Sequence, residues 1–153
     1  MKRKKVLVAG TFDIIHPGHI YLFKKASELG DVIVIVARDN SVKRFKGRPP
    51  IIPEEQRLEV VSSIKYVKKA ILGHDDADIL KIVEEIKPDI ILLGPDQNFK
   101  EEDIAKELER RGLKVEVRRA EQYIECSFCS TSKIIKRVIE LYKDNQIKIP
   151  SAQ

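Results

Sequence analysis

The chain has 153 residues, of which 42% are hydrophobic and 35% charged, and its formal net charge is +5. This is the size of one domain, large enough to bury a core without disulfides or metal. No run of 18 apolar residues is present, which argues against a transmembrane helix.

The first residues and the cysteine content bear on location and partners. The apolar run behind the basic start of the chain is too short for a signal peptide, and two cysteines suit a reducing cytoplasm, so we expect a cytoplasmic protein with no membrane partner. The net charge fits either an ordinary basic surface or the binding of a polyanion such as a nucleoside triphosphate. Dispersed basic residues and only 6% aromatic content argue against a nucleic-acid partner.

Strand and helix patterns alternate along the chain. They predict a strand at 6–9, a helix at 18–29, a strand at 32–37, a polar loop at 38–52 and a helix at 53–63. A strand at 67–72, a helix from Asp75 or Asp76 to 86 and a strand at 90–93 follow. The remaining elements are a helix at 101–111, a strand at 113–117, a loop at 119–130 and a helix at 131–142.

This order predicts an α/β fold with a single doubly wound, parallel, five-stranded, Rossmann-like sheet of buried strands. We expect one domain at 1–143 and a polar tail at 144–153. Ligands of such sheets bind beyond the carboxyl ends of the strands, which directs attention to the loops that start at Gly10, Arg38, Gly73 and Gly94.

The turn from Gly10 to His19 is the most informative segment. Pro17 suits the first position of a helix, so His16 and His19 lie on one side of its first turn. The free N–H groups there attract phosphate, and Gly18 allows a phosphate to approach the backbone. The alternatives are two unrelated surface histidines, or zinc with a third ligand from Asp13 or a distant loop. We expect no metal site made by the protein alone.

Three segments resemble the HxGH nucleotidylyltransferase superfamily. Gly10-Thr11-Phe12-Asp13 followed by His16-Pro17-Gly18-His19 looks like its first signature in the wording of the cytidylyltransferase-like branch. The segment from Ser130 to Arg137 resembles a second signature, which opens a helix near the triphosphate. Gly94-Pro95-Asp96 resembles a third element, which contacts the nucleoside. The resemblance implies a Rossmann-like nucleotidylyltransferase fold.

Within this superfamily the chain is most similar to the archaeal FAD synthases. The similarity rests on the short chain, on Gly94-Pro95-Asp96-Gln97-Asn98, and on the segment from Glu125 to Ser132 with its two cysteines. It implies transfer of the AMP moiety of ATP to FMN, which yields FAD and pyrophosphate, with Mg²⁺ brought in by ATP. The alternatives are cytidylyl or adenylyl transfer to glycerol 3-phosphate or phosphopantetheine, and a non-catalytic nucleotide-binding sensor. A homodimer is expected only because homodimers are common.

The resemblance also implies roles for individual residues. His16 and His19 are the expected catalytic residues, which stabilise charge on the phosphates. The expected nucleotide-binding residues are Thr11, Phe12, Pro17, Gly18, Asp96, Tyr123, Ser130, Thr131, Ser132 and Arg137. For Asp96, Tyr123 and Arg137 the alternatives are a turn aspartate, a core tyrosine and a solvated helix charge.

The remaining candidates carry weaker signals. Substrate or phosphate contacts are conceivable for Asp13, Lys24, Lys46, Arg57 and Asn98, and solvated or structural roles remain open for them. Cys126 and Cys129 form a C-x-x-C pair. The alternatives are two partly buried thiols, a redox-sensitive pair that forms a disulfide or has a lowered thiol pKa, and a structural zinc site, which would need two more ligands and has only His74 as a spare histidine. Because the two cysteines directly precede Ser130, their oxidation would disturb the phosphate site, so we expect activity to need reducing conditions.

Overall fold

The computed structural model describes residues 2–123 and 126–151. Its elements in chain order are β1 (Lys5–Gly10), α1 (Pro17–Leu29), β2 (Asp31–Val36), α2 (Asp39–Lys46), α3 (Glu54–Ser62), β3 (Lys69–Leu72), α4 (Lys81–Ile86), β4 (Ile90–Leu93), α5 (Glu101–Arg110), β5 (Glu116–Arg119) and α6 (Thr131–Lys143). The strands form one sheet in the order β3-β2-β1-β4-β5, and every pair is parallel. The predicted doubly wound α/β sheet is therefore confirmed.

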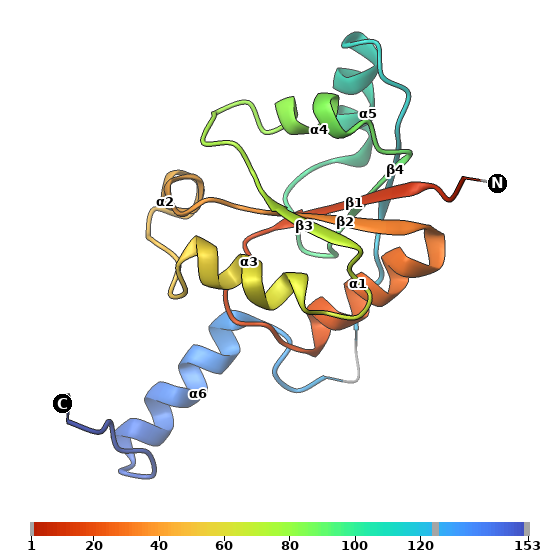
Figure 1. Cartoon of the computed structure of the whole chain (residues 1–153). Helices are drawn as coiled ribbons and strands as arrows, with labels where there is room; N and C mark the ends of the chain where they lie inside the picture. The colour runs from red at the N-terminus through yellow and green to blue at the C-terminus, as the bar shows by residue number, and fades with distance from the viewer. Residues whose placement is uncertain (1, 124–125, 152–153) are drawn as a thin grey trace.

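Side-chain alternation along the strands builds two apolar cores, one on each face of the sheet. Val6 and Val8 of β1 pack with Phe23 of α1 and Val61 of α3 on one face. Leu7, between the two valines, joins the core formed with α4 and α5 on the other face. Figure 1 shows α1 and α3 below the sheet and α4 and α5 above it. The strand order reverses between β1 and β4, so the loops after these strands border the crevice in which such sheets bind ligands.

The predicted loop at 38–52 contains a helix, α2, that the sequence pattern missed. Only Ser41 and Val42 of this helix are buried, so it carries no apolar stripe to reveal it. Its charges match the helix dipole, with Asp39 in the first turn and three basic residues in the last. Gly47 ends it in the left-handed conformation, with φ of 72°.

Two further boundaries differ from the prediction. α4 begins at Lys81, because the carboxylates of Asp76 and Asp78 accept hydrogen bonds from backbone N–H groups two residues on and hold this segment in turns. β5 lies at Glu116–Arg119, later than predicted, because Leu113 N–H bonds back to Leu108 O and ends α5. β3 and β5 are edge strands with partly exposed residues, so the expectation of five buried strands was wrong for these two.

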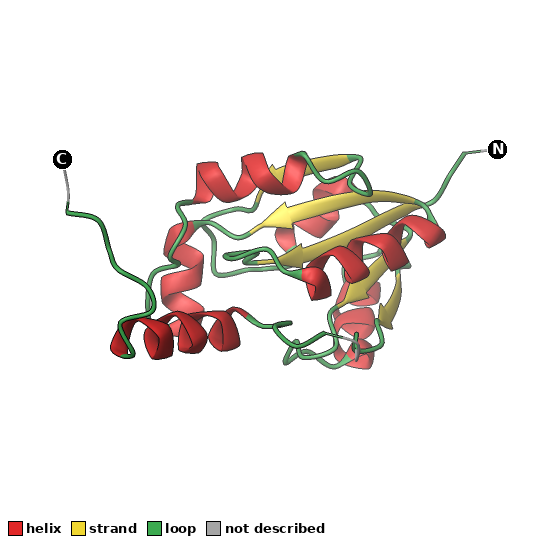
Figure 2. Ribbon diagram, turned by 90° about the horizontal axis from the view of Figure 1, so that it is seen from below, coloured by secondary structure: helices red, strands yellow, loops and turns green. Residues whose placement is uncertain are grey.

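The last helix, α6, leaves the body of the molecule. None of its residues is buried, and it lies apart from the sheet at the side toward which the strands point (Figure 2). α6 does end at Lys143, but the boundary between a domain at 1–143 and a tail at 144–153 stays a prediction. Residues 1 and 152–153 lie outside the described residues. Among the described residues, no helix is both long and apolar enough to cross a membrane.

Candidate active site

The turn between β1 and α1 is shaped by close aromatic packing. Phe12 adopts a left-handed backbone, with φ of 53°, and its ring lies over Gly10. A Cβ atom on Gly10 would come within 2.9 Å of that ring, so only glycine fits there. The buried Phe12 ring contacts Phe23 and meets the ring of His19 edge-on, with centroids 5.4 Å apart. Phe12 thus anchors the turn, which leaves only its backbone for the expected nucleotide contact.

The two histidines cap the helix that they open. The Nδ1 atom of His16 accepts a hydrogen bond from Gly18 N–H at 3.1 Å, and that of His19 accepts one from His16 N–H at 3.2 Å. Because each Nδ1 is an acceptor, each neutral ring carries its proton on Nε2. The rings are stacked, with centroids 3.7 Å apart. The turn therefore holds two neighbouring Nε2–H donors beside the amino end of α1.

Both imidazoles are neutral at neutral pH. Burial lowers the pKa of His19 to about 3, with further contributions from the nearby His16 and Lys46. Burial also lowers the pKa of His16. A neutral ring still donates a hydrogen bond, and its donor strengthens as negative charge develops on a phosphate oxygen.

Asp13 and Arg57 hold the turn in place through bonds within the protein. The Asp13 carboxylate accepts from Ile51 N–H at 2.9 Å and Ile52 N–H at 2.8 Å. The Arg57 side chain is completely buried, and it donates to Thr11 O, to Ile52 O and to Asp39 Oδ1. These bonds favour the structural alternative for Asp13 and Arg57, in which the two side chains position the turn.

The two candidate lysines belong to different helices, Lys24 to α1 and Lys46 to α2. Lys46, at the end of α2, is close enough to influence the pKa of His19. Desolvation and the charge of Arg48 lower the pKa of Lys46 itself, whereas Asp13 opposes the change. Lys24 is exposed on α1 and lines a surface cavity with His16. Only Lys46 is thus brought beside the histidine pair.

The loop after β4 is fixed by two residues that sequence reasoning missed. Gln97 accepts from Gly94 N–H and donates to Ala9 O, which ties the loop to β1. Arg119, at the end of β5, donates to four carbonyls of this loop, those of Gly94, Pro95, Gln97 and Phe99. Gln97 stood within the Gly94–Asn98 segment, but nothing in the sequence signalled the role of Arg119.

The loop after β4 carries the nucleotide candidate Asp96 and the substrate or phosphate candidate Asn98. Asp96 and Asn98 are both exposed at its surface. They lie near the carboxyl ends of β4 and β1, where the strand order reverses. The loop therefore presents these two side chains at the ligand-binding edge of the sheet.

The amino end of α6 faces the same region. Ser130 is its N-cap, and its hydroxyl accepts from Lys133 N–H at 3.1 Å. Thr131 and Ser132 form the first turn, where the N–H groups point outward. Arg137 lies beyond this turn and forms an ion pair with Glu140 at 3.9 Å. The structure thus groups the three hydroxyls and places Arg137 farther along the helix.

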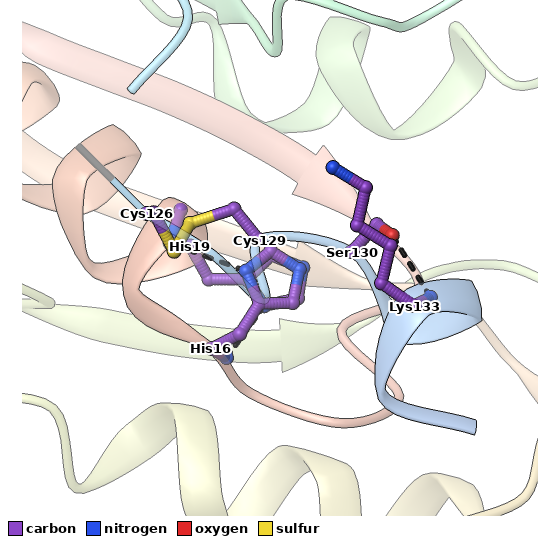
Figure 3. Close-up of a disulfide and its surroundings, with 7 residues drawn as sticks. His16, His19, Cys126, Cys129, Ser130 and Lys133 are labelled. Carbon is purple, nitrogen blue, oxygen red and sulfur yellow. Dashed lines mark hydrogen bonds between the residues drawn. A yellow bond between two sulfur atoms is a disulfide. The ribbon is translucent and has the colours of Figure 1, made fainter. Parts of the chain in front are cut away.

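The cysteine loop closes over the histidine turn. Cys126 and Cys129 form a disulfide, which Figure 3 shows next to His16 and His19. A Cβ atom on Gly18 would lie 3.4 Å from Cβ of Cys129 and 2.9 Å from the His16 ring. The His16 ring and Cys129 therefore leave little room for a side chain at position 18. Glu125, which opens the cysteine segment, lies outside the described residues.

Tyr123 is the last of the candidate nucleotide-binding residues. The ring of Tyr123 stacks on that of Tyr21 in α1, with centroids 4.9 Å apart and planes inclined by 17°. It lines the same surface cavity as Lys24 and His16. Within residues 2–123 and 126–151, no group of three or more His, Cys, Asp or Glu side chains is arranged to hold a metal ion.

Comparison with known proteins identifies a family and close relatives of this chain. The profile of the cytidylyltransferase-like family matches residues 7–137. The FAD synthase of Methanopyrus kandleri is 46% identical over 150 residues, which cover 95% of this chain and 99% of the relative. The FAD synthase of Archaeoglobus profundus is 54% identical over 140 residues, with coverage of 91% and 88%.

A solved structure supports the same assignment. A lipopolysaccharide core biosynthesis protein from Thermoplasma volcanium superposes with a TM-score of 0.75 and 42% identity, covering 79% of this chain and 98% of that one. The profile, the relatives and the fold agree over most of the chain, including the histidine turn and the amino end of α6. The chain therefore belongs to the cytidylyltransferase-like family.

Proposed function

We propose that the protein transfers the AMP moiety of ATP to FMN, forming FAD and pyrophosphate. The observation that carries the proposal is the pair of neutral Nε2–H donors on His16 and His19 at the amino end of α1. The choice of FMN as acceptor rests on the relatives named FAD synthase, which match nearly the whole chain.

The reaction needs positioning more than acid–base chemistry. An oxygen of the FMN phosphate attacks the α-phosphorus of ATP, a new P–O bond forms, and the bond to the bridging oxygen breaks to release pyrophosphate. The second pKa of a phosphate monoester is about 6, so the attacking oxygen is largely ionised at neutral pH and no general base is required. His16 and His19 donate to the α-phosphate oxygens, where negative charge shifts in the transition state.

The rest of the cradle follows from the surrounding elements. Ser130, Thr131 and Ser132 at the amino end of α6 hold the β- and γ-phosphates. Asp96 and Asn98 contact the nucleoside on the loop after β4. A divalent cation, expected to be Mg²⁺, arrives bound to the triphosphate, since phosphate oxygens and water suit it. Lys46 adds positive charge beside the histidines, and Arg137 adds it farther along α6.

Location and assembly remain part of the proposal. We place the reaction in the cytoplasm, a reducing compartment in which the Cys126–Cys129 disulfide of this structure would be opened to two thiols. A homodimer fits the exposed apolar side chains on α6, which include Val138, Ile139 and Tyr142. Light scattering at several protein concentrations measures the assembly directly, and a monomer at every concentration would overturn the dimer.

The test of function is a substrate matrix in reducing buffer with Mg²⁺. ATP and CTP are each offered with FMN, glycerol 3-phosphate and phosphopantetheine, and pyrophosphate release is measured together with the identity of the product. We expect turnover with ATP and FMN at least tenfold above every other pair. Preference for another acceptor would replace FMN, while tight ATP binding without turnover would make the protein a sensor. His74→Ala should give the same turnover as the wild type with ATP and FMN, because His74 is exposed after β3, bonds to Glu85 and lies outside the His16–His19 pair.

A further inference from the structure

A surface cavity of about 660 Å³ begins at His16 and follows the outer side of α1. Four of its lining residues, Pro17, Ile20, Tyr21 and Lys24, have the spacing i, i+3, i+4 and i+7, so they form one stripe along the helix. Its volume lies within the usual range of about 300–1,000 Å³ for small-molecule sites. We call this cavity the α1 groove.

The α1 groove is rich in flat aromatic surface. Three of the chain's four tyrosines line it, namely Tyr21, Tyr66 and Tyr123. Tyr21 and Tyr123 are stacked with their planes inclined by only 17°, and both are half-buried. A stacked pair with remaining exposure offers its faces and edges to another planar ring.

The two ends of the α1 groove differ chemically. One end is His16, whose ring stacks on His19 at the proposed site of phosphoryl transfer. The other end is Lys24, an exposed cation about 12 Å along the helix from His16, at 1.5 Å per residue. A ligand with a phosphate at one end, a short flexible chain and a large planar ring with carbonyl oxygens fits the order of His16, the tyrosine rings and Lys24 along the groove.

We propose that the α1 groove binds the isoalloxazine ring of FMN, with the FMN phosphate placed at His16 and the ring carbonyls toward Lys24. This inference rests on the proposed function, and it assigns the acceptor subsite of the same reaction. It reassigns Tyr123 from the adenine of ATP to the flavin. In-line displacement requires acceptor and leaving group on opposite sides of the α-phosphorus, and the pyrophosphate is assigned to the amino end of α6.

Adenine is the competing occupant of the α1 groove. The loop after β4 already offers the nucleoside a site, because Gln97 and Arg119 hold its backbone and leave Asp96 and Asn98 exposed. If ATP occupies that loop and the α6 end, the α1 groove, which His16 and three tyrosines line, is left for the acceptor. The test below separates the two ligands.

The test uses Tyr21→Leu and Tyr123→Leu, which keep an apolar side chain but remove the flat ring. Phe45→Leu is the matched control, because Phe45 is an aromatic residue that is exposed on α2 and does not line the groove. Tyr21→Phe keeps the ring and guards against a folding defect. FMN binding without ATP is measured by quenching of flavin fluorescence, riboflavin serves as a competitor without phosphate, and KM is measured for both substrates.

We expect each Leu variant to weaken FMN and riboflavin binding about tenfold, which is a typical loss for one stacked ring. The KM for FMN should rise in parallel and the KM for ATP should stay within twofold. Tyr21→Phe should bind FMN more tightly than Tyr21→Leu, and Phe45→Leu should match the wild type. FAD formation with unchanged FMN affinity in both Leu variants would overturn the α1 groove and leave the proposed function standing. A rise in the KM for ATP alone would show that the groove binds adenine, and it would also overturn the assignment of the groove to the flavin.

Two further outcomes keep the proposals separable. Tyrosine-dependent binding of FMN by a wild-type protein that makes no FAD would support the α1 groove and refute the proposed function. A wild-type protein that neither binds FMN nor makes FAD would refute both.

Discussion

Cys129 lies against Gly18 so closely that a methyl group on the glycine would come within 3.4 Å of the cysteine Cβ atom. The cysteine loop and the first turn of α1 are therefore in contact, although they are more than a hundred residues apart in the sequence. The space beside Gly18 that a Cβ atom would occupy is therefore bordered by the ring of His16 and by Cys129.

Replacing Gly18 by alanine tests this contact. The new methyl group would meet the His16 ring at 2.9–3.0 Å and Cys129 at 3.4 Å, so the ring must move. We expect kcat/KM to fall by about tenfold to a hundredfold, since misplacing a catalytic group by about 1 Å has a cost of this order. Glu28→Ala, on the exposed side of the same helix, should leave kcat/KM unchanged. An unaltered kcat/KM in Gly18→Ala would show that the turn tolerates the displacement.

The cysteine pair predicts sensitivity to oxidation. The disulfide holds Cys129 over the Gly18 backbone, which the phosphate must approach. We expect oxidised protein to lose most of its activity and dithiothreitol to restore it. The double variant Cys126→Ser/Cys129→Ser should keep its activity under oxidation. Equal wild-type activity before and after complete thiol oxidation, verified by mass spectrometry, would contradict the prediction.

His19 predicts a large loss in the chemical step. His19→Ala removes a preorganised donor to the α-phosphate, so kcat should fall by roughly 10²–10³. The measurement is steady-state pyrophosphate release at saturating substrates, with His74→Ala as the variant that removes a histidine outside the site. A decrease in kcat of less than about threefold would reject the catalytic role of His19.

The lowered pKa of His19 predicts a loss of stability in acid. Its pKa is about 3 in the folded state, against 6.5 for a free histidine, so between these values the unfolded chain binds the extra proton. The free energy of unfolding should therefore decrease as pH falls through this range, by about 1–2 kcal/mol from pH 7 to pH 5 for His19. His19→Gln preserves an acceptor at the cap without titrating, so its unfolding free energy should decrease less.

The control for the wild type and His19→Gln is their unfolding at higher pH. Between pH 7.5 and 8.5 His19 is neutral in both states, so denaturant unfolding of the wild type and His19→Gln should show the same pH dependence. An identical pH dependence between pH 7 and pH 5 would refute the burial of a neutral His19.

Arg57 predicts a stability effect, since it contacts the turn from within. Its side chain is fully buried and donates to Thr11 O, Ile52 O and Asp39. Arg57→Met leaves these acceptors unpaired and should lower the free energy of unfolding by about 3–5 kcal/mol, measured with guanidinium chloride. Arg110→Met, which breaks an exposed pair with Glu107, should change it far less. A similar change in both variants would mean that burial of Arg57 is unimportant.

The residues that sequence reasoning placed well are those with local signals. Val6, Val8 and the other β-branched residues marked their strands because burial on both faces requires continuous apolar runs. His16 and Pro17 marked the start of α1 because the helix entrance depends only on neighbouring residues. The grouping of the histidine turn with Ser130 came from the resemblance to a family, since no local pattern joins segments so far apart.

The residues that it misplaced depend on distant partners. Arg57 was a candidate substrate or phosphate contact, and its burial became evident only from the approach of Thr11 and Asp39 in the folded chain. Arg119 reads as an ordinary charge on an edge strand, yet its acceptors lie in the loop after β4. The short helix α2 escaped because it packs little apolar surface, so its formation depends on capping charges and tertiary bonds.

The hydrogen bonds from Arg119 to the loop after β4 affect the entropy of nucleotide binding. The loop after β4 is already ordered by these bonds before a nucleotide arrives, so binding loses little conformational freedom there. α6 has no buried residue to fix its position. The cost of ordering the triphosphate cradle therefore falls mainly on α6, and tethering α6 to the body should increase ATP affinity more than any stiffening of the β4 loop.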